Sequence, residues 1–240
     1  MSQQITLFDL ANQQGTCWSL NPWKTRFVLN FKGLDYKTEW LEYPNIKPRL
    51  EPHLPGLEAY TSPTIVYSDG RYVADSRAIA ELLEREHPSP SLHLDAPVLK
   101  KLEGLVAELM PKIRVVYMPV VYKRILHQDQ ANIDYWVATR TKRAGMTLDE
   151  MEKKEGGTVW QEAAEPYLRQ VTELLKENDK GPFFLGDTVS YADFVWAGLL
   201  IFVRRVGDDF FQPLLDRTGD RKAHEDLLKA VEPWSKRDDH

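Results

Sequence analysis

The amino-acid sequence predicts two structural units in one chain, an α/β domain over residues 1–88 and an all-helical domain over residues 98–240. Three observations predict this organisation. Strand-like and helix-like segments alternate through the first unit, which is the pattern of an α/β domain. Residues 89–97 are rich in Ser, Pro and Asp and are typical of a linker. The apolar patterns that follow have helical spacing.

The first unit opens with a strand, a helix and a second strand. Residues 5–8 are a short apolar strand candidate, and residues 36–41 alternate in the manner of another strand. Between them, apolar residues recur at helical spacing. Pro22 suits the first position of that helix and Asn21 is a good N-cap, while Gly33 suits its end. We therefore expect the helix to begin near Asn21.

The rest of the first unit predicts a hairpin and a helix. Residues 44–60 contain four prolines and favour only a weak or irregular helix. Residues 64–67 and 72–74 are strand candidates, and Ser68-Asp69-Gly70 between them suits a tight turn. A helix is expected from Ser76 onward, because apolar residues then line one face.

The second unit is predicted from amphipathic segments at residues 99–127, 147–154 and 160–177. Pro111 and Pro119 should end or kink the first of these, since proline lacks an N–H and crowds the preceding turn. Later, Ser190 and Asp193 form a capping box before an apolar run, which predicts a central buried helix. The structure of residues 128–157 stays open, and the charged tail after Trp234 is expected to fray.

The composition excludes several classes of protein. The net charge is −5 and no long basic run is present, which argues against a nucleic-acid partner. Residues 1–4 are polar and the apolar stretch after them is short, so we expect neither a signal peptide nor a membrane span, and a cytoplasmic location. Cys17 is the single cysteine and the six histidines are scattered, so no internal disulfide and no metal site are expected.

Several motifs resemble landmarks of the cytosolic glutathione transferases across nearly the whole chain. They are Thr-Ser-Pro-Thr-Ile at residues 61–65, Asp75-Ser76 and Ser-Tyr-Ala-Asp at residues 190–193. Residues 18–26 and 29–34 are similar to the fungal etherase-related, serine-type glutathione transferases, and through them to bacterial β-etherases. The resemblance implies a thioredoxin-like N-terminal domain, an all-α C-terminal domain, glutathione as co-substrate and a homodimer.

Glutathione is expected to bind in an extended form beside Pro63. A cis bond there would turn the amide and carbonyl of Ser62 outward to pair with a peptide ligand, whereas a trans bond would make Pro63 an ordinary turn residue. Asp75 and Ser76 open a helix, where the positive dipole end favours the γ-glutamyl carboxylate, although helix capping alone would also explain them. Lys47 is a candidate partner for the glycyl carboxylate.

Ser19 and Asn21 are the candidates for stabilising the glutathione thiolate. They lie just before the first helix, where a hydroxyl or amide donor and the helix dipole can lower the pKa of a thiol. The resemblance to serine-type enzymes favours Ser19. Alternatively Asn21 only caps the helix and Ser19 is a loop hydroxyl. Cys17 offers a further alternative, a thiol transferase that forms a mixed disulfide with glutathione, or it is a bystander.

A hydrophobic aromatic compound is the expected second ligand. Met110, Tyr117 and Tyr122 belong to an apolar and aromatic stripe around the two prolines, and Trp18 adds aromatic surface near the thiol. Core packing explains such a stripe equally well.

Three functions follow from the resemblance. An enzyme would conjugate glutathione to an aromatic compound, cleave an ether in it or deglutathionylate it. A ligandin would bind aromatic or polyphenolic molecules with little turnover, and a non-catalytic module would not bind glutathione at all.

Overall fold

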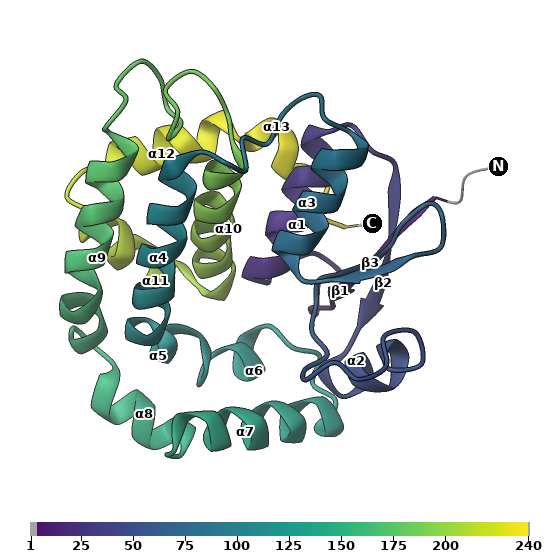
Figure 1. Ribbon diagram of the computed structural model, residues 1–240. Coiled ribbons are helices and arrows are strands. Elements are labelled where there is room, and N and C mark those ends of the chain that lie inside the picture. The colour runs from purple at the N-terminus through teal and green to yellow at the C-terminus, as the bar shows by residue number, and fades with distance from the viewer. Residues whose placement is uncertain (1–3, 240) are drawn as a thin grey trace.

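The computed structural model describes residues 4–239, so residues 1–3 of the polar N-terminal segment and residue 240 lie outside it. Within the described part a four-stranded mixed sheet lies on one side of the molecule and a group of helices on the other (Figure 1). The strands, in the order β2-β1-β3-β4, are β1 (Ile5–Leu10), β2 (Tyr36–Leu41), β3 (Thr64–Val66) and β4 (Tyr72–Ala74). β1 is parallel to β2 and antiparallel to β3, and β4 pairs antiparallel with β3. The predicted fold class is confirmed.

Three helices accompany the sheet: α1 (Leu20–Phe31), α2 (Tyr43–Leu50) and α3 (Ser76–Glu86). α1 begins near Asn21, as predicted, but the assignment of Asn21 as its N-cap was wrong. Ser19 has extended backbone angles and is the N-cap, and Leu20 is the first helical residue. The reason is packing, because Leu20 is buried in the core while Asn21 is exposed. Asn21 therefore lies in the first turn of α1.

The remaining helices form the other side of the molecule. They are α4 (Pro97–Lys112), α5 (Arg114–Tyr117), α6 (Val121–Arg124), α7 (Gln130–Ala144), α8 (Leu148–Glu155), α9 (Val159–Leu175), α10 (Tyr191–Val206), α11 (Asp208–Asp216), α12 (Arg221–Ala230) and α13 (Glu232–Ser235). Pro111 lies in the last turn of α4, and Pro119 falls between the single turns α5 and α6. The two prolines thus break the long segment as predicted.

α10 is the central buried helix that the sequence predicts. Asp193 accepts hydrogen bonds from the Ser190 N–H at 2.7 Å and from the Ser190 hydroxyl at 2.9 Å, which closes the predicted capping box. α10 packs along α1, where the rings of Phe27 and Phe194 stack at 5.1 Å. The two sides of the molecule therefore share one apolar core.

The charged tail after α13 does not fray within the described residues. The Cys17 N–H donates to the carbonyl of Asp238 at 2.7 Å, and the Asn30 side-chain amide donates to the carbonyl of Trp234 at 2.7 Å. Arg237 also lies over the Tyr36 ring, with its Cζ 4.0 Å from the ring centre. The expectation failed because backbone carbonyls and cation–π contacts hold a segment that carries little apolar surface.

No helix in the described range 4–239 is long and apolar enough to cross a membrane. The same residues contain no cluster of three or more His, Cys, Asp or Glu side chains that could hold a metal ion.

His224 on α12 is a buried neutral imidazole whose two ring nitrogens both have partners. Trp196 Nε1, which can only donate, lies 2.8 Å from His224 Nδ1, so Nδ1 accepts and the proton sits on Nε2. Nε2 lies 2.8 Å from the Thr172 hydroxyl, which in turn donates to the carbonyl of Thr218. Burial lowers the pKa of His224 to about 4.

This pKa predicts that His224 makes folding stability depend on pH. The folded-state pKa lies below the unfolded value of 6.5, so the contribution of His224 is complete above pH 6.5 and is lost as the pH falls towards 4. Between pH 7.5 and 5 we expect this group to lower the free energy of unfolding by about 2 kcal/mol. Urea unfolding of the wild type and of His224→Gln at both pH values measures it.

The comparison of wild type with His224→Gln isolates the contribution of His224, because both proteins contain Asp193, a buried carboxyl group whose pKa is also strongly shifted. Burial raises the pKa of Asp193 to about 6, which acts in the opposite direction over the same pH range. Equal pH dependence in the two proteins would refute the prediction.

Candidate active site

Two pockets meet at the N-terminal end of α1. The first, called here the sheet-edge pocket, has a volume of about 360 Å³ and is lined by Leu10, Ser19, Asn21, Tyr43, Ile46, Tyr60, Thr61, Ser62, Tyr135, Thr139, Arg140 and Arg143. It extends from the start of α1 to the segment before β3.

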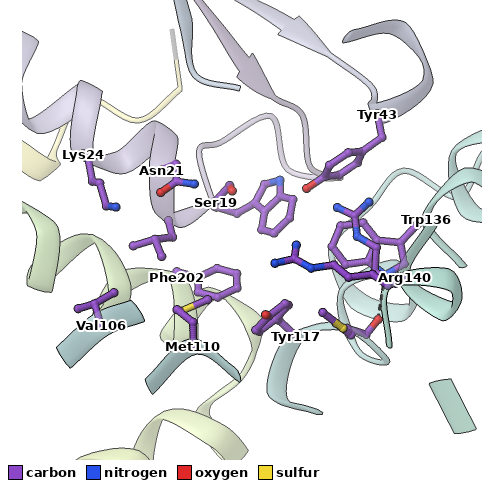
Figure 2. Close-up of a pocket in the computed structure, with 14 residues that line it drawn as sticks. Ser19, Asn21, Lys24, Tyr43, Val106, Met110, Tyr117, Trp136, Arg140 and Phe202 are labelled. Carbon is purple, nitrogen blue, oxygen red and sulfur yellow. Dashed lines mark hydrogen bonds between the residues drawn. The ribbon is translucent and has the colours of Figure 1, made fainter. Parts of the chain in front are cut away.

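The second pocket, called here the helix pocket, has a volume of about 350 Å³ (Figure 2). It is lined by Trp18, Ser19, Leu20, Asn21, Lys24, Tyr43, Val106, Met110, Tyr117, Met118, Trp136, Arg140, Arg143 and Phe202. Ser19, Asn21, Tyr43, Arg140 and Arg143 line both pockets. The two pockets therefore adjoin, and these five residues mark their junction.

Ser19 and Asn21 line the junction of the two pockets, and both lie at the N-terminal, positive end of α1. Ser19 is the N-cap of α1, and its side chain makes no capping hydrogen bond. Asn21, in the first turn, is exposed. The hydroxyl and the amide are thus free to donate to a bound anion, and the unpaired amides of the first helical turn add their partial positive charge.

The Ser62–Pro63 peptide bond is cis, as predicted, and Ser62 lines the sheet-edge pocket. The Ser62 hydroxyl donates to the carbonyl of Phe8 in β1 at 3.1 Å, which fixes the segment against the sheet. The Asp75 N–H donates to the carbonyl of Pro63 at 3.3 Å. The start of α3 therefore lies directly beside the cis bond.

Asp75 and Ser76 are brought to this edge, but neither lines the two pockets. Asp75 has a φ of 79° and its Oδ1 accepts from the Arg77 N–H at 2.8 Å and the Ala78 N–H at 3.1 Å. Asp75 thus caps α3, and Ser76 is buried with its carbonyl bonded to the Tyr191 hydroxyl at 3.2 Å. Lys47 also lies outside both pockets, and its ammonium group is 3.6 Å from Glu51.

The predicted aromatic stripe is only partly in the site. Trp18, Met110 and Tyr117 line the helix pocket, but Tyr122 does not. Tyr122 belongs to α6, a separate turn after the break at Pro119, so it does not continue the stripe. The ammonium group of Lys123 lies 5.6 Å from the centre of the Tyr122 ring.

Helix α7 supplies site residues that the sequence analysis missed. It runs beneath α2 (Figure 1), where the Tyr43 ring meets the Trp136 ring edge to face at 5.0 Å. Arg140 lies one turn after Trp136, with its Cζ 3.8 Å from the Trp136 ring centre and 4.7 Å from that of Tyr43. Asp129 as N-cap and Gly145 as C-terminal stop were the signals that could have located this helix.

A polar contact holds the start of α7 against the start of α2. Glu42, the residue before α2, accepts a hydrogen bond from the Asn132 side-chain amide and lies 2.5 Å from His127 Nδ1. A carboxylate only accepts, so His127 Nδ1 carries the proton in this pair. Glu42 therefore joins two segments of the helical side to the sheet side of the molecule.

Comparison with known families identifies this architecture. Residues 18–86 match the glutathione S-transferase N-terminal domain, and residues 105–234 match the glutathione S-transferase C-terminal domain. The chain belongs to the glutathione S-transferase family. The suspected kinship to cytosolic glutathione transferases is thereby confirmed.

The most similar known proteins include several from fungi. The glutathione S-transferase-like protein ustS of Aspergillus flavus is 27% identical over 228 residues, which cover 88% of this chain and 83% of the relative. A glutathione transferase of Phanerochaete chrysosporium, GSTFuA3, is 27% identical with a TM-score of 0.80 and 98% coverage of both chains. A glutathione S-transferase of Ceriporiopsis subvermispora, crystallised with glutathione, is 28% identical with a TM-score of 0.81, covering 97% of this chain and 98% of its own.

Cys17 is poorly suited to act as the reactive group of this transferase. Its side chain is fully buried and lines neither pocket. Burial, with the nearby charge of Asp9, raises the pKa of the Cys17 thiol well above its usual range. The thiolate that a mixed disulfide requires is therefore suppressed, which argues for the bystander interpretation.

The Glu42 contact predicts that this carboxylate contributes to holding α7 in place. In Glu42→Gln, the acceptor for both His127 and Asn132 is weakened, and we expect amide hydrogen exchange in residues 130–144 to accelerate about tenfold. Mass-spectrometric exchange of the wild type and the variant measures this. Glu51→Gln is the matched control, because Glu51 is exposed and its ion pair is with Lys47, away from α7. Unchanged exchange over α7 in Glu42→Gln would disprove the role of the contact.

Proposed function

We propose that this glutathione transferase holds glutathione in the sheet-edge pocket and presents its thiolate, at Ser19 and Asn21, to an aromatic compound in the helix pocket. The observation that carries the proposal is the shared junction of the two pockets at the start of α1. A nucleophile in one pocket and an electrophile in the other would meet where hydroxyl, amide and helix-end donors converge.

Glutathione would lie along the segment before β3. Its cysteinyl backbone would pair with Ser62, and its γ-glutamyl carboxylate would face Ser76 at the positive end of α3. Both capping bonds of Asp75 are accepted by Oδ1, which leaves Oδ2 for the ligand's ammonium group. Lys47 remains the proposed partner of the glycyl carboxylate, and its exposed pair with Glu51 would have to open for this.

The chemistry needs no protein nucleophile. A free thiol has a pKa of about 8.5, so donors that favour the anion raise the thiolate population at neutral pH and release the proton to solvent. The thiolate sulfur then forms a bond to an electrophilic carbon, and a halide or an ether oxygen leaves with the bonding electrons. Conjugation and etherase-type cleavage thus share the same first step in this site. We also propose a cytoplasmic homodimer, in keeping with the resemblance noted above.

The second candidate function is that of a ligandin. The helix pocket has an aromatic lining that includes Trp18, Tyr117, Trp136 and Phe202, which suits binding of flat aromatic molecules without reaction. The two functions separate by turnover: a ligandin would bind such molecules saturably while thiol-dependent conversion of electrophiles stays at background.

Ser19 is predicted to be the principal donor to the thiolate. In Ser19→Ala, kcat/KM for glutathione conjugation should fall about 10- to 100-fold, because one charge-assisted hydrogen bond is lost. The pKa of bound glutathione, followed by thiolate absorbance, should rise in parallel. Ser19→Thr, which keeps a hydroxyl, should restore most of both. If the pKa of glutathione bound to Ser19→Ala equals that in the wild type while Asn21→Ala raises it, Asn21 is the principal donor.

Tyr117 is predicted to contact the second ligand, and Tyr122 is its natural control. Tyr117→Ala should weaken binding of an aromatic dye about 5- to 10-fold through lost apolar contact, with little change in glutathione affinity. Tyr122→Ala removes the same ring from a position outside the pocket and should leave dye binding intact. Equal effects of the two substitutions on dye fluorescence titrations would place the ligand elsewhere.

A further inference from the structure

The lining of the helix pocket contains positively charged side chains and no acidic ones. Lys24, Arg140 and Arg143 line it, and no Asp or Glu is among the lining residues of either pocket. The molecule as a whole is acidic, with a net charge of −5. The charge of this site is therefore opposite in sign to that of the protein that surrounds it.

These three cations also have no salt bridge in the described part of the chain, unlike other basic residues on the same side of the molecule. Arg124, for example, pairs with Asp209 at 2.7 Å, and Lys123 pairs with Glu152 at 3.0 Å. No carboxylate lies within 4.0 Å of the cationic nitrogens of Lys24, Arg140 or Arg143 among residues 4–239. Three positive groups facing one cavity are thus left for a ligand to neutralise.

Arg140 and Lys24 lie at positions where a bound anion would be electrostatically favoured. Burial lowers the pKa of Arg140; Tyr43 and Tyr135 oppose this effect, while the neighbouring charge of Arg143 adds to it. A negative charge bound nearby would favour the charged guanidinium. Arg140 Nη1 donates to the Thr139 hydroxyl at 2.8 Å and the guanidinium stacks on Trp136, which fixes its position. Burial likewise lowers the pKa of Lys24, and the charges of Glu103 and Asp75 act in the opposite direction.

The cations stand on opposite walls with apolar surface between them. Lys24 projects from α1 on one side, and Arg140 lies with Trp136 on the other (Figure 2). Met110 and Phe202 lie on the wall between them. A ring packed on this apolar surface would place an acidic substituent within reach of a cation at either end.

We infer that the helix pocket selects aromatic compounds that carry a carboxylate, and that Lys24 and Arg143 determine this specificity. The inference rests on the proposed function of this pocket as the site of the second ligand. Arg143 is exposed, so its guanidinium can turn to meet a carboxylate in a bidentate manner, while Arg140, stacked on Trp136, contributes fixed charge.

Glutathione itself carries carboxylates, so it is the alternative ligand for these positively charged side chains. Arg140 and Arg143 also line the sheet-edge pocket, whereas Lys24 lines the helix pocket alone. An anion site that belongs to glutathione would leave Lys24 unexplained. It would also be filled whenever glutathione is bound, which gives a direct way to separate the two occupants.

The test compares binding of 3,5-dinitrobenzoate with that of its uncharged methyl ester, followed by quenching of tryptophan fluorescence, since Trp18 and Trp136 line the pocket. Each titration is made with and without saturating S-methylglutathione, which cannot react and fills the glutathione site. The wild type should bind the acid about tenfold more tightly than the ester. Lys24→Gln and Arg143→Gln should each reduce this ratio to about two or less.

Lys142→Gln is the matched control, because Lys142 is an exposed cation on α7 that lines neither pocket, and it should keep the full ratio. An equal affinity of the wild type for acid and ester overturns the inference. A preference that disappears when S-methylglutathione is added also overturns it, because the charges then serve glutathione.

The test does not depend on catalysis, so the two proposals can fail separately. A persistent preference for the acid without any thiol-dependent turnover would sustain the anion site and favour the ligandin function. Turnover of neutral electrophiles with an acid-to-ester ratio of one would sustain the transferase and remove the anion site.

Discussion

The contact between α1 and α10 is the constraint on which the site depends. The rings of Phe27 and Phe194 stack with only 2° between their planes, and α10 approaches the start of α1 at Gly198. A Cβ at Gly198 would already lie 3.4 Å from the carbonyl oxygen of Leu20, so larger side chains there would force the helices apart. Because the first turn of α1 rests on the helical side of the molecule, its N-cap, Ser19, stands where both sides can reach it. The junction of the two pockets is a consequence of this packing.

A buried ion pair fixes the other face of α1. Arg26 Nε lies 2.7 Å from Asp9 at the end of β1, both side chains are fully buried, and Arg26 Nη2 donates to the Thr38 hydroxyl at 2.9 Å. Removing two charges from water costs about as much as their attraction returns, so such a pair adds little net stability. Here it sets the position of α1 against the sheet. The loop that leads to Ser19 is then held from outside by the hydrogen bond between Cys17 and Asp238.

The sequence predicted the features that local chemistry determines. β2 was placed at its observed bounds, the capping box of Ser190 was found from spacing, and the cis bond at Pro63 followed from a recognised motif. α7 was not predicted from the sequence, because its contacts are not those of an apolar stripe. Among its residues only Asn132 and Trp136 are buried, and it docks through amide, carboxylate, aromatic and guanidinium groups. Such contacts show no periodicity in the sequence, and their partners Glu42 and Tyr43 are distant along the chain.

The residues of α7 also determine the charge of the site. Arg140 and Arg143 line both pockets, so the helix pocket and the sheet-edge pocket share the same two positive charges. Glu42 and the ring of Tyr43 join α7 to the sheet side of the molecule. The two guanidinium groups therefore owe their place at the junction of the pockets to a small set of polar and aromatic contacts, because the apolar burial that holds α10 is largely missing from α7.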